Sequence, residues 1–156
     1  MTRTPLHVRK KIARAYAEAR RHQALQPLTD SQVLDISTIA WVTLRAITES
    51  GEATESAWAV LAQASNMALL LAEKEIGDEW LPQIKSAQDA LMRAAHRGKR
   101  TGRWGLDGDG IRAIETALEV HDQQIALATR AEILSALATL RARIDKGHVL
   151  ETEAIN

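Results

Sequence analysis

The residues most able to do chemistry in this 156-residue chain are basic side chains gathered in two short stretches. Residues 1–22 contain seven Lys and Arg residues against one acid, and residues 93–103 contain five more with no acid. Guanidinium and ammonium groups at this density bind phosphate oxygens, and an indole beside them can stack on a base. The candidate nucleic-acid-binding residues are Arg9, Lys10, Lys11 and Arg14 in the first stretch and Arg97, Lys99, Arg100, Arg103 and Trp104 in the second.

Charge is distributed unevenly along the chain although it sums to zero. The 20 Lys and Arg residues equal the 20 Asp and Glu residues, which excludes a globally basic nucleic-acid binder. Twelve cations lie in the two basic stretches, so the other 123 residues hold 8 cations against 19 anions. A second interpretation is therefore open. In it, the first stretch pairs with acidic segments such as residues 73–79, in its own chain or in a partner, and Trp104 fills the core.

Motifs for catalysis or metal binding are missing from the sequence. There is no cysteine, and the five histidines lack the helix-face spacing to carboxylates that zinc and di-iron sites require. Only His121, next to Asp122, has acidic neighbours. The glycine-rich segment 98–110 matches neither a phosphate loop nor a calcium loop, and no Gly-x-Ser-x-Gly motif occurs. We therefore predict a protein that is not an enzyme and uses no cofactor or metal.

The elements that must position these side chains are predicted to be helices throughout. Apolar residues recur with the helical period between sparse Gly and Pro breaks. We predict an all-α, five-helix bundle with a long C-terminal helix. The expected helices span about residues 8–22, 29–49, 54–76, 82–98 and 107–147. Thr29 and Gln32 form a capping box at the start of the second. The second and third helices have the least polar surface, so we expect them innermost, with Trp41 and Trp58 buried.

The last predicted helix is unusually long and has two apolar stripes. It meets no Gly or Pro between residues 111 and 146, roughly 36 residues or about 54 Å. One stripe can pack on the bundle, which leaves the other, with Val120, Leu127 and Leu134, for a second copy of the chain. We therefore expect a homodimer through those three residues. The alternatives are that one bundle buries both stripes, or that Thr129 breaks the helix and the chain folds back.

Three regions are expected along the chain. Residues 1–27 form a basic N-terminal arm or helix, residues 28–147 a helical bundle domain, and residues 148–156 a flexible tail. The longest apolar run, residues 67–72, is too short to cross a bilayer, and no apolar stretch of signal-peptide length follows the basic start. We expect a cytoplasmic protein without a membrane partner.

Five segments of the chain resemble a known group of sequences. They are Trp58–Ala62, Asn66–Ala68, Ala87–Leu91, Arg103–Gly105 and Ala117–Gln124. Through them, roughly residues 30–145 resemble a family of short helical proteins from proteobacterial chromosomes, plasmids and prophages, some labelled Fis-like transcriptional regulators. The resemblance implies a regulatory or mobile-element setting and no catalytic residue. Residues 141–156 lack the compact recognition hairpin that Fis proteins place last, so the basic N-terminal arm is the better candidate for nucleic acid.

Two functions follow as hypotheses. The first is a dimeric nucleic-acid-associated regulator that presents a basic N-terminal helix to phosphates. The second is a protein-binding inhibitor or adaptor, encoded by a mobile element, that binds no nucleic acid. The expected partners are a second copy of the chain together with nucleic acid or a protein.

Overall fold

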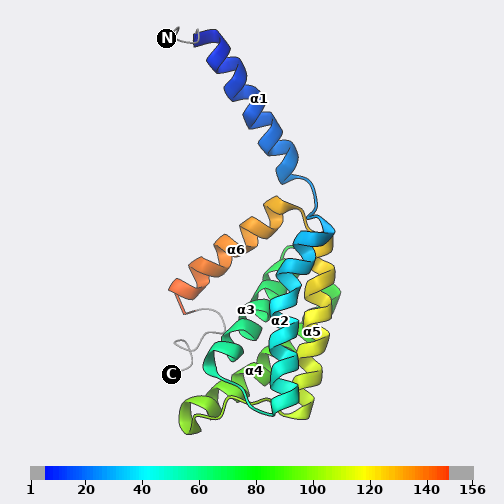
Figure 1. Cartoon of the computed structure of the whole chain (residues 1–156), viewed down its shortest axis with the longest axis vertical. Coiled ribbons are helices and arrows are strands. Elements are labelled where there is room, and N and C mark those ends of the chain that lie inside the picture. Colours follow the sequence, from blue (N-terminus) through cyan, green and yellow to red (C-terminus); the bar gives the residue numbers. More distant parts are fainter. Residues whose placement is uncertain (1–5, 148–156) are drawn as a thin grey trace.

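The protein is built from helices connected by short loops. The computed structural model describes residues 6–147, and no strand occurs among them, which confirms the all-α prediction. The helices, seen in Figure 1, are α1 (Leu6–Ala24), α2 (Asp30–Ser50), α3 (Glu55–Ala72), α4 (Leu81–Thr101), α5 (Gly108–Leu127) and α6 (Arg130–Asp145), with a short 3₁₀ turn η1 (Asp78–Trp80) before α4. No described helix is long and apolar enough to cross a membrane. The predicted tail, residues 148–156, lies outside the described part of the chain.

Local capping residues set where several helices begin and end. Thr29 and Gln32 form the predicted capping box at the start of α2. Thr54 accepts a hydrogen bond from the Ala57 N–H, 3.1 Å away, at the start of α3. At the end of α4, Gly102 takes the left-handed conformation, with φ of 74°, and its N–H bonds to the Gly98 carbonyl. These contacts satisfy backbone groups that have no partner within the helix itself.

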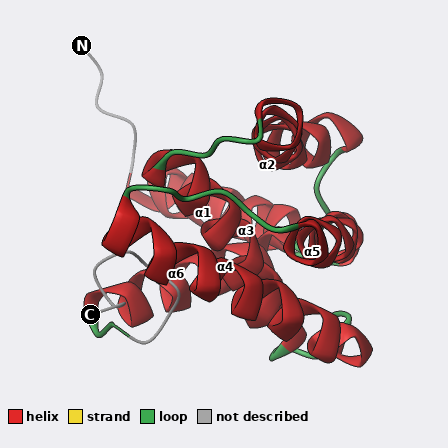
Figure 2. Ribbon diagram, turned by 90° about the horizontal axis from the view of Figure 1, so that it is seen from below, coloured by secondary structure: helices red, strands yellow, loops and turns green. Residues whose placement is uncertain are grey.

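The core surrounds α3, which packs against α2, α4, α5 and α6 and lies between them in Figure 2. Eleven of its eighteen residues are buried, and Trp58 donates its indole N–H to the Leu91 carbonyl at 2.8 Å. Its small side chains, such as Ala62 and Ala68, allow four helices to approach. The prediction that α3 is innermost and that Trp58 is buried is confirmed.

The prediction that α2 is also innermost is wrong. Only one stripe of α2 is buried, against α3 and α5, because no other helix in the described part of the chain covers its outer faces. Leu34, Ile39 and Val42 are mostly exposed, and Trp41 is only partly buried. The apolar side chains on the outer side of α2 therefore lie at the surface of the described structure.

The prediction of a single long C-terminal helix is also wrong, because the helix is interrupted at Ala128. That residue is extended, with ψ of 145°, and Thr129 caps a new helix through a capping box with Glu132. Helix α6 then crosses α3 instead of continuing α5 (Figure 1). Its buried residues, including Ile133 and Leu140, form a cluster with Met67, Leu70 and Leu71 of α3. The alternative with a break at Thr129 is thus the observed one.

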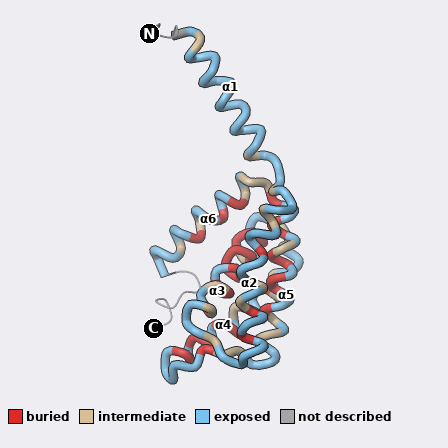
Figure 3. The backbone as a smooth tube through the Cα atoms, in the orientation of Figure 1, coloured by how far each residue is buried: buried red, intermediate tan, exposed pale blue. Residues whose placement is uncertain are grey.

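Helix α1 projects from the rest of the molecule (Figure 3). Every residue from Arg9 to Gln23 is exposed, and only its end approaches α6. The connector that follows is held in place, since the Arg130 N–H donates to the Gln26 carbonyl at 3.1 Å and Pro27 pairs with Thr129. The packed helices α2–α6, here called the body, fix the point from which α1 emerges. They do not bury the residues of α1 between Arg9 and Gln23.

Candidate functional site

The first basic stretch lies on α1, with its cations directed into solvent. Arg9, Lys10, Lys11 and Arg14 are all exposed, and no Lys or Arg of α1 makes an ion pair among the described residues. At 100° per residue, Lys10, Arg14 and Arg21 fall on one side of the helix. This side is free to contact an anionic partner.

The opposite side of α1 is apolar. Val8, Ile12, Ala15, Tyr16 and Ala19 fall within an arc of roughly 100°. Tyr16 is 67% exposed and Ile12 is also exposed. The helix therefore offers two separate surfaces, one cationic and one apolar, and neither is covered by residues 6–147.

The second basic stretch lies at the other end of the molecule, at the end of α4 (Figure 1). Lys99, Arg100 and Arg103 are exposed. Arg97 instead donates from Nη2 to the carbonyl of Gly105 and so braces the following loop. The structure does not bring the two predicted basic stretches together.

Trp104 is part of the core rather than a platform for bases. Its side chain is 8% exposed, and its ring lies 5.7 Å from that of Trp58, with the two planes tilted by 55°. Gly98 of α4 lies directly under the indole. Beside it, a polar hollow of about 610 Å³ is lined by Arg97 and Arg103 but also by the carboxylate side chains Glu52 and Asp107. Opposed charges make this hollow a poor phosphate site.

The residues predicted to form a dimer interface do not share a surface. Val120 is 4% exposed and packs in a cluster with Ala68, Ala72 and Ile84. Leu127 is 75% exposed and Leu134 is mostly exposed, but they belong to different helices on either side of the break. The interface expected from one continuous stripe is therefore wrong, since the stripe is divided between α5 and α6.

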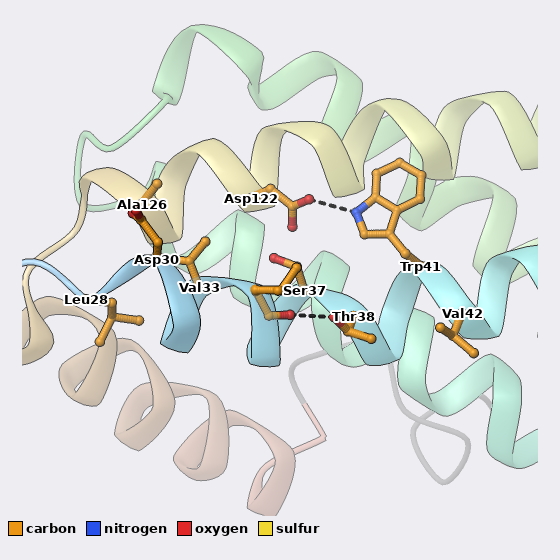
Figure 4. A pocket seen from close by; sticks show the side chains of 10 residues that line it. Leu28, Asp30, Val33, Ser37, Thr38, Trp41, Val42, Asp122 and Ala126 are labelled. Carbon is orange, nitrogen blue, oxygen red and sulfur yellow. Dashed lines mark hydrogen bonds between the residues drawn. The ribbon is translucent and has the colours of Figure 1, made fainter.

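An open, mainly apolar groove lies between α2 and α5 (Figure 4). It measures about 470 Å³ and is lined by Leu28, Asp30, Val33, Leu34, Ser37, Thr38, Trp41, Val42, Asp122 and Ala126. Trp41 donates its indole N–H to Asp122 Oδ2 at 2.7 Å across the groove floor. Sequence reasoning did not identify this site, because its two central residues are 81 positions apart and only the packing of α2 on α5 joins them.

Asp122 is held in its charged form by its neighbours. Burial alone would raise the pKa of this carboxyl, but interactions with His121, Ser37 and Trp41 outweigh that effect and lower the pKa. His121 Nδ1 lies 3.8 Å from Asp122 Oδ1. No hydrogen bond joins Ser37 Oγ to His121 Nδ1 in the described structure. The bond from Trp41 to Asp122 links α2 to α5.

Comparison of the chain with models of known families, with curated proteins and with solved structures finds no match. The regulatory or mobile-element setting implied by the sequence resemblance therefore remains a prediction.

Proposed function

We propose that this protein binds nucleic acid through the phosphate backbone and acts as a dimeric regulator, with α1 as the contact element. The observation that carries the proposal is the exposure of six Lys and Arg residues on one projecting helix, none of them in an ion pair within the described residues. Unpaired cations of this density are costly to bring together unless an anionic partner neutralises them.

The form of α1 suits a duplex. A straight helix with Lys and Arg residues along one side can lie against the phosphate backbone of a duplex. The 19 residues of α1 extend about 28 Å. Its cations contact phosphates, which position a protein on DNA but carry no sequence information. We therefore expect weak sequence preference and strong dependence on salt.

Charge neutralisation of α1 tests the proposal. A variant with Arg9, Lys10, Lys11 and Arg14 changed to Gln is compared with a matched variant in which Lys99, Arg100 and Arg103 are changed to Gln. Binding of a fluorescent duplex is followed by anisotropy from 25 to 300 mM salt, with nuclease-treated protein. The first variant should weaken binding to all sequences alike and flatten the log–log salt slope by about 0.9 for each lost contact.

The second variant is expected to retain most of the affinity, because its three cations lie at the opposite end of the molecule from α1. Absence of binding at low salt would contradict the proposal, as would unchanged binding by the α1 variant. Equal loss in both variants would show that net charge matters and that α1 is not the contact element.

A protein-binding inhibitor or adaptor is a second candidate, and one observation favours it. On the side of α2 that faces α6, a hollow of about 280 Å³ is lined mainly by apolar side chains, including the exposed Ile36, Ile39 and Leu137. Apolar side chains grouped at a surface are typical of protein interfaces. This candidate is preferred if the wild-type protein shows no affinity for nucleic acid at low salt.

A further inference from the structure

We propose that the apolar stripe of α1 docks in the α2–α5 groove of a second copy of the chain, and that the exchange is reciprocal. The resulting homodimer has two bodies, each covered by its partner's N-terminal helix. The inference assigns a dimer contact to residues that the sequence did not indicate. It does not depend on whether α1 binds nucleic acid.

The two surfaces are both apolar and both uncovered. Most helical stability in proteins comes from packing of an apolar face. The described part of the chain, residues 6–147, gives α1 no such packing between Arg9 and Gln23. The groove likewise exposes Leu34 and Val42 along its α2 edge. Covering each with the other removes both from water.

The lengths agree. The groove is lined along α2 from Asp30 to Val42, a rise of about 18 Å at 1.5 Å per residue. The stripe of α1 runs from Val8 to Ala19, about 17 Å by the same rise. One helix therefore fits along the groove without a large unmatched end.

The acidic residues beside the groove complement the basic residues of α1. Residues 30–44 of α2 and 113–127 of α5, the stretches on either side of the groove, contain five carboxylates and no Lys or Arg, namely Asp30, Asp35, Glu115, Glu119 and Asp122. Asp30 and Asp122 line the groove itself, and spacings of four and three residues place Glu115 and Glu119 on the same face of α5 as Asp122. The first cation beyond the α2 wall, Arg45, is paired with Glu49 at 2.7 Å.

The cations of α1 divide into two sets with respect to this groove. Arg9 and Arg20 lie along one edge of the apolar stripe and Lys11 lies near the other, so a docked α1 holds them beside the acidic walls. Lys10, Arg14 and Arg21 lie on the far side and stay exposed. Docking therefore uses some cations for the dimer and leaves others for phosphate.

The connector favours a second copy over the chain's own groove. Only residues 25–29 join α1 to α2. They are fixed by the bond from the Arg130 N–H to the Gln26 carbonyl and by the Pro27–Thr129 pair, which direct α1 away from the body. Folding α1 back along α2 requires these contacts to break, whereas docking on a neighbour retains them.

Disulfide trapping tests the inference directly, because the chain contains no cysteine. A tagged chain with Ile12→Cys is mixed with an untagged chain with Leu34→Cys and oxidised mildly, and the mixed dimer is resolved on a non-reducing gel. Ala17→Cys, on the side of α1 opposite the stripe, replaces Ile12→Cys in the matched control. We expect a mixed disulfide with Ile12→Cys at a yield at least about tenfold above that of the control.

Three outcomes overturn the inference. Equal or absent mixed disulfide in the two arms shows that the stripe does not face the groove. A monomeric internal disulfide in a chain carrying both Ile12→Cys and Leu34→Cys shows docking within one chain. A disulfide between two Ile12→Cys chains as the main product shows that two α1 helices pair with each other.

Charge reversal gives a second measurement that does not depend on cysteine chemistry. Arg9→Glu with Arg20→Glu should raise the dimer dissociation constant at least about tenfold in sedimentation, because like charges then meet across the groove. Adding Glu119→Arg, which can face only one of the two reversed positions, should restore part of the lost affinity. A wild-type chain that is monomeric at high micromolar concentration, or a reversal that is not rescued, overturns the inference even if α1 binds nucleic acid normally.

Discussion

Adding one methyl group at Gly98 should destabilise the protein by disturbing the packing of Trp104. Gly98 lies inside α4 and is buried against the indole. A Cβ at this position would lie 2.6 Å from Cε2 and 2.8 Å from Cε3 of Trp104, closer than real Cβ contacts come. The ring has little room to retreat, because Trp58 packs on it with a centroid separation of 5.7 Å.

Two opposing effects determine the size of the change. Replacing Gly by Ala inside a helix stabilises it by about 1 kcal/mol, whereas overpacking a core costs about 1–3 kcal/mol. Because the clash involves a rigid ring and not the end of a flexible chain, we take overpacking near the top of its range. Gly98→Ala should therefore lower the free energy of unfolding by about 1–2 kcal/mol, which lowers Tm by about 2–8 °C at this chain length.

The assay is urea unfolding followed by tryptophan fluorescence and by circular dichroism. Gly108→Ala, at the exposed first position of α5, is the matched control and should change stability by no more than a few tenths of a kcal/mol. In a Trp104→Leu background the clash is removed, so Gly98→Ala should become neutral or stabilising. If Gly98→Ala stabilises the protein both in the wild-type chain and in the Trp104→Leu background, the buried position of Trp104 is refuted.

Three further predictions follow from the described contacts. Asp122→Asn should cost about 1–2 kcal/mol at pH 7, because the indole N–H of α2 loses a charged acceptor. Since the folded pKa of Asp122 is lowered, this stabilisation is present above about pH 4 and is lost as pH falls through the lowered value. In urea titrations, the difference in unfolding free energy between Asp122→Asn and wild type should therefore be smaller at pH 3 than at pH 7. Thr129→Ala should cost about 1 kcal/mol in the same assay by removing the cap of α6, similar to Thr54→Ala at α3, and no loss would show that the cap does not hold the break. Leu127→Glu should leave thermal stability within about 0.5 kcal/mol of wild type, whereas Val120→Glu, which buries an unpaired charge, should prevent folding; equal tolerance would contradict the burial of Val120.

The sequence alone determined the helical class, the first four helices and most of their ends. These depend on contacts between residues within four positions of each other, which a linear pattern contains. Thr29 with Gln32 at α2 and Thr54 at α3 are caps of this kind, and the capping box at α2 is the one predicted. The exposed basic character of α1 is also local, because it follows from composition and helical period.

The break between α5 and α6 shows where a local signal is present but not decisive. Thr129 and Glu132 have the sequence of a capping box, but the helical period of apolar residues continues across them. A cap stabilises a helix end by only about 1 kcal/mol, which does not by itself decide that the helix ends there. The fold settles the competition because Ile133, Ala136 and Leu140 are buried on α3 only if the chain turns.

Only the tertiary structure decided which surfaces are covered. The hydrophobic effect has no direction, so an apolar stripe states that burial is favourable without stating which partner provides it. The same kind of stripe is packed on α3 and α4 side chains near Val120, left at the surface along α2, and left exposed on α1. Trp104 and the bond between Trp41 and Asp122 follow the same rule, since an indole can be buried, exposed or hydrogen-bonded according to neighbours that come from distant parts of the chain.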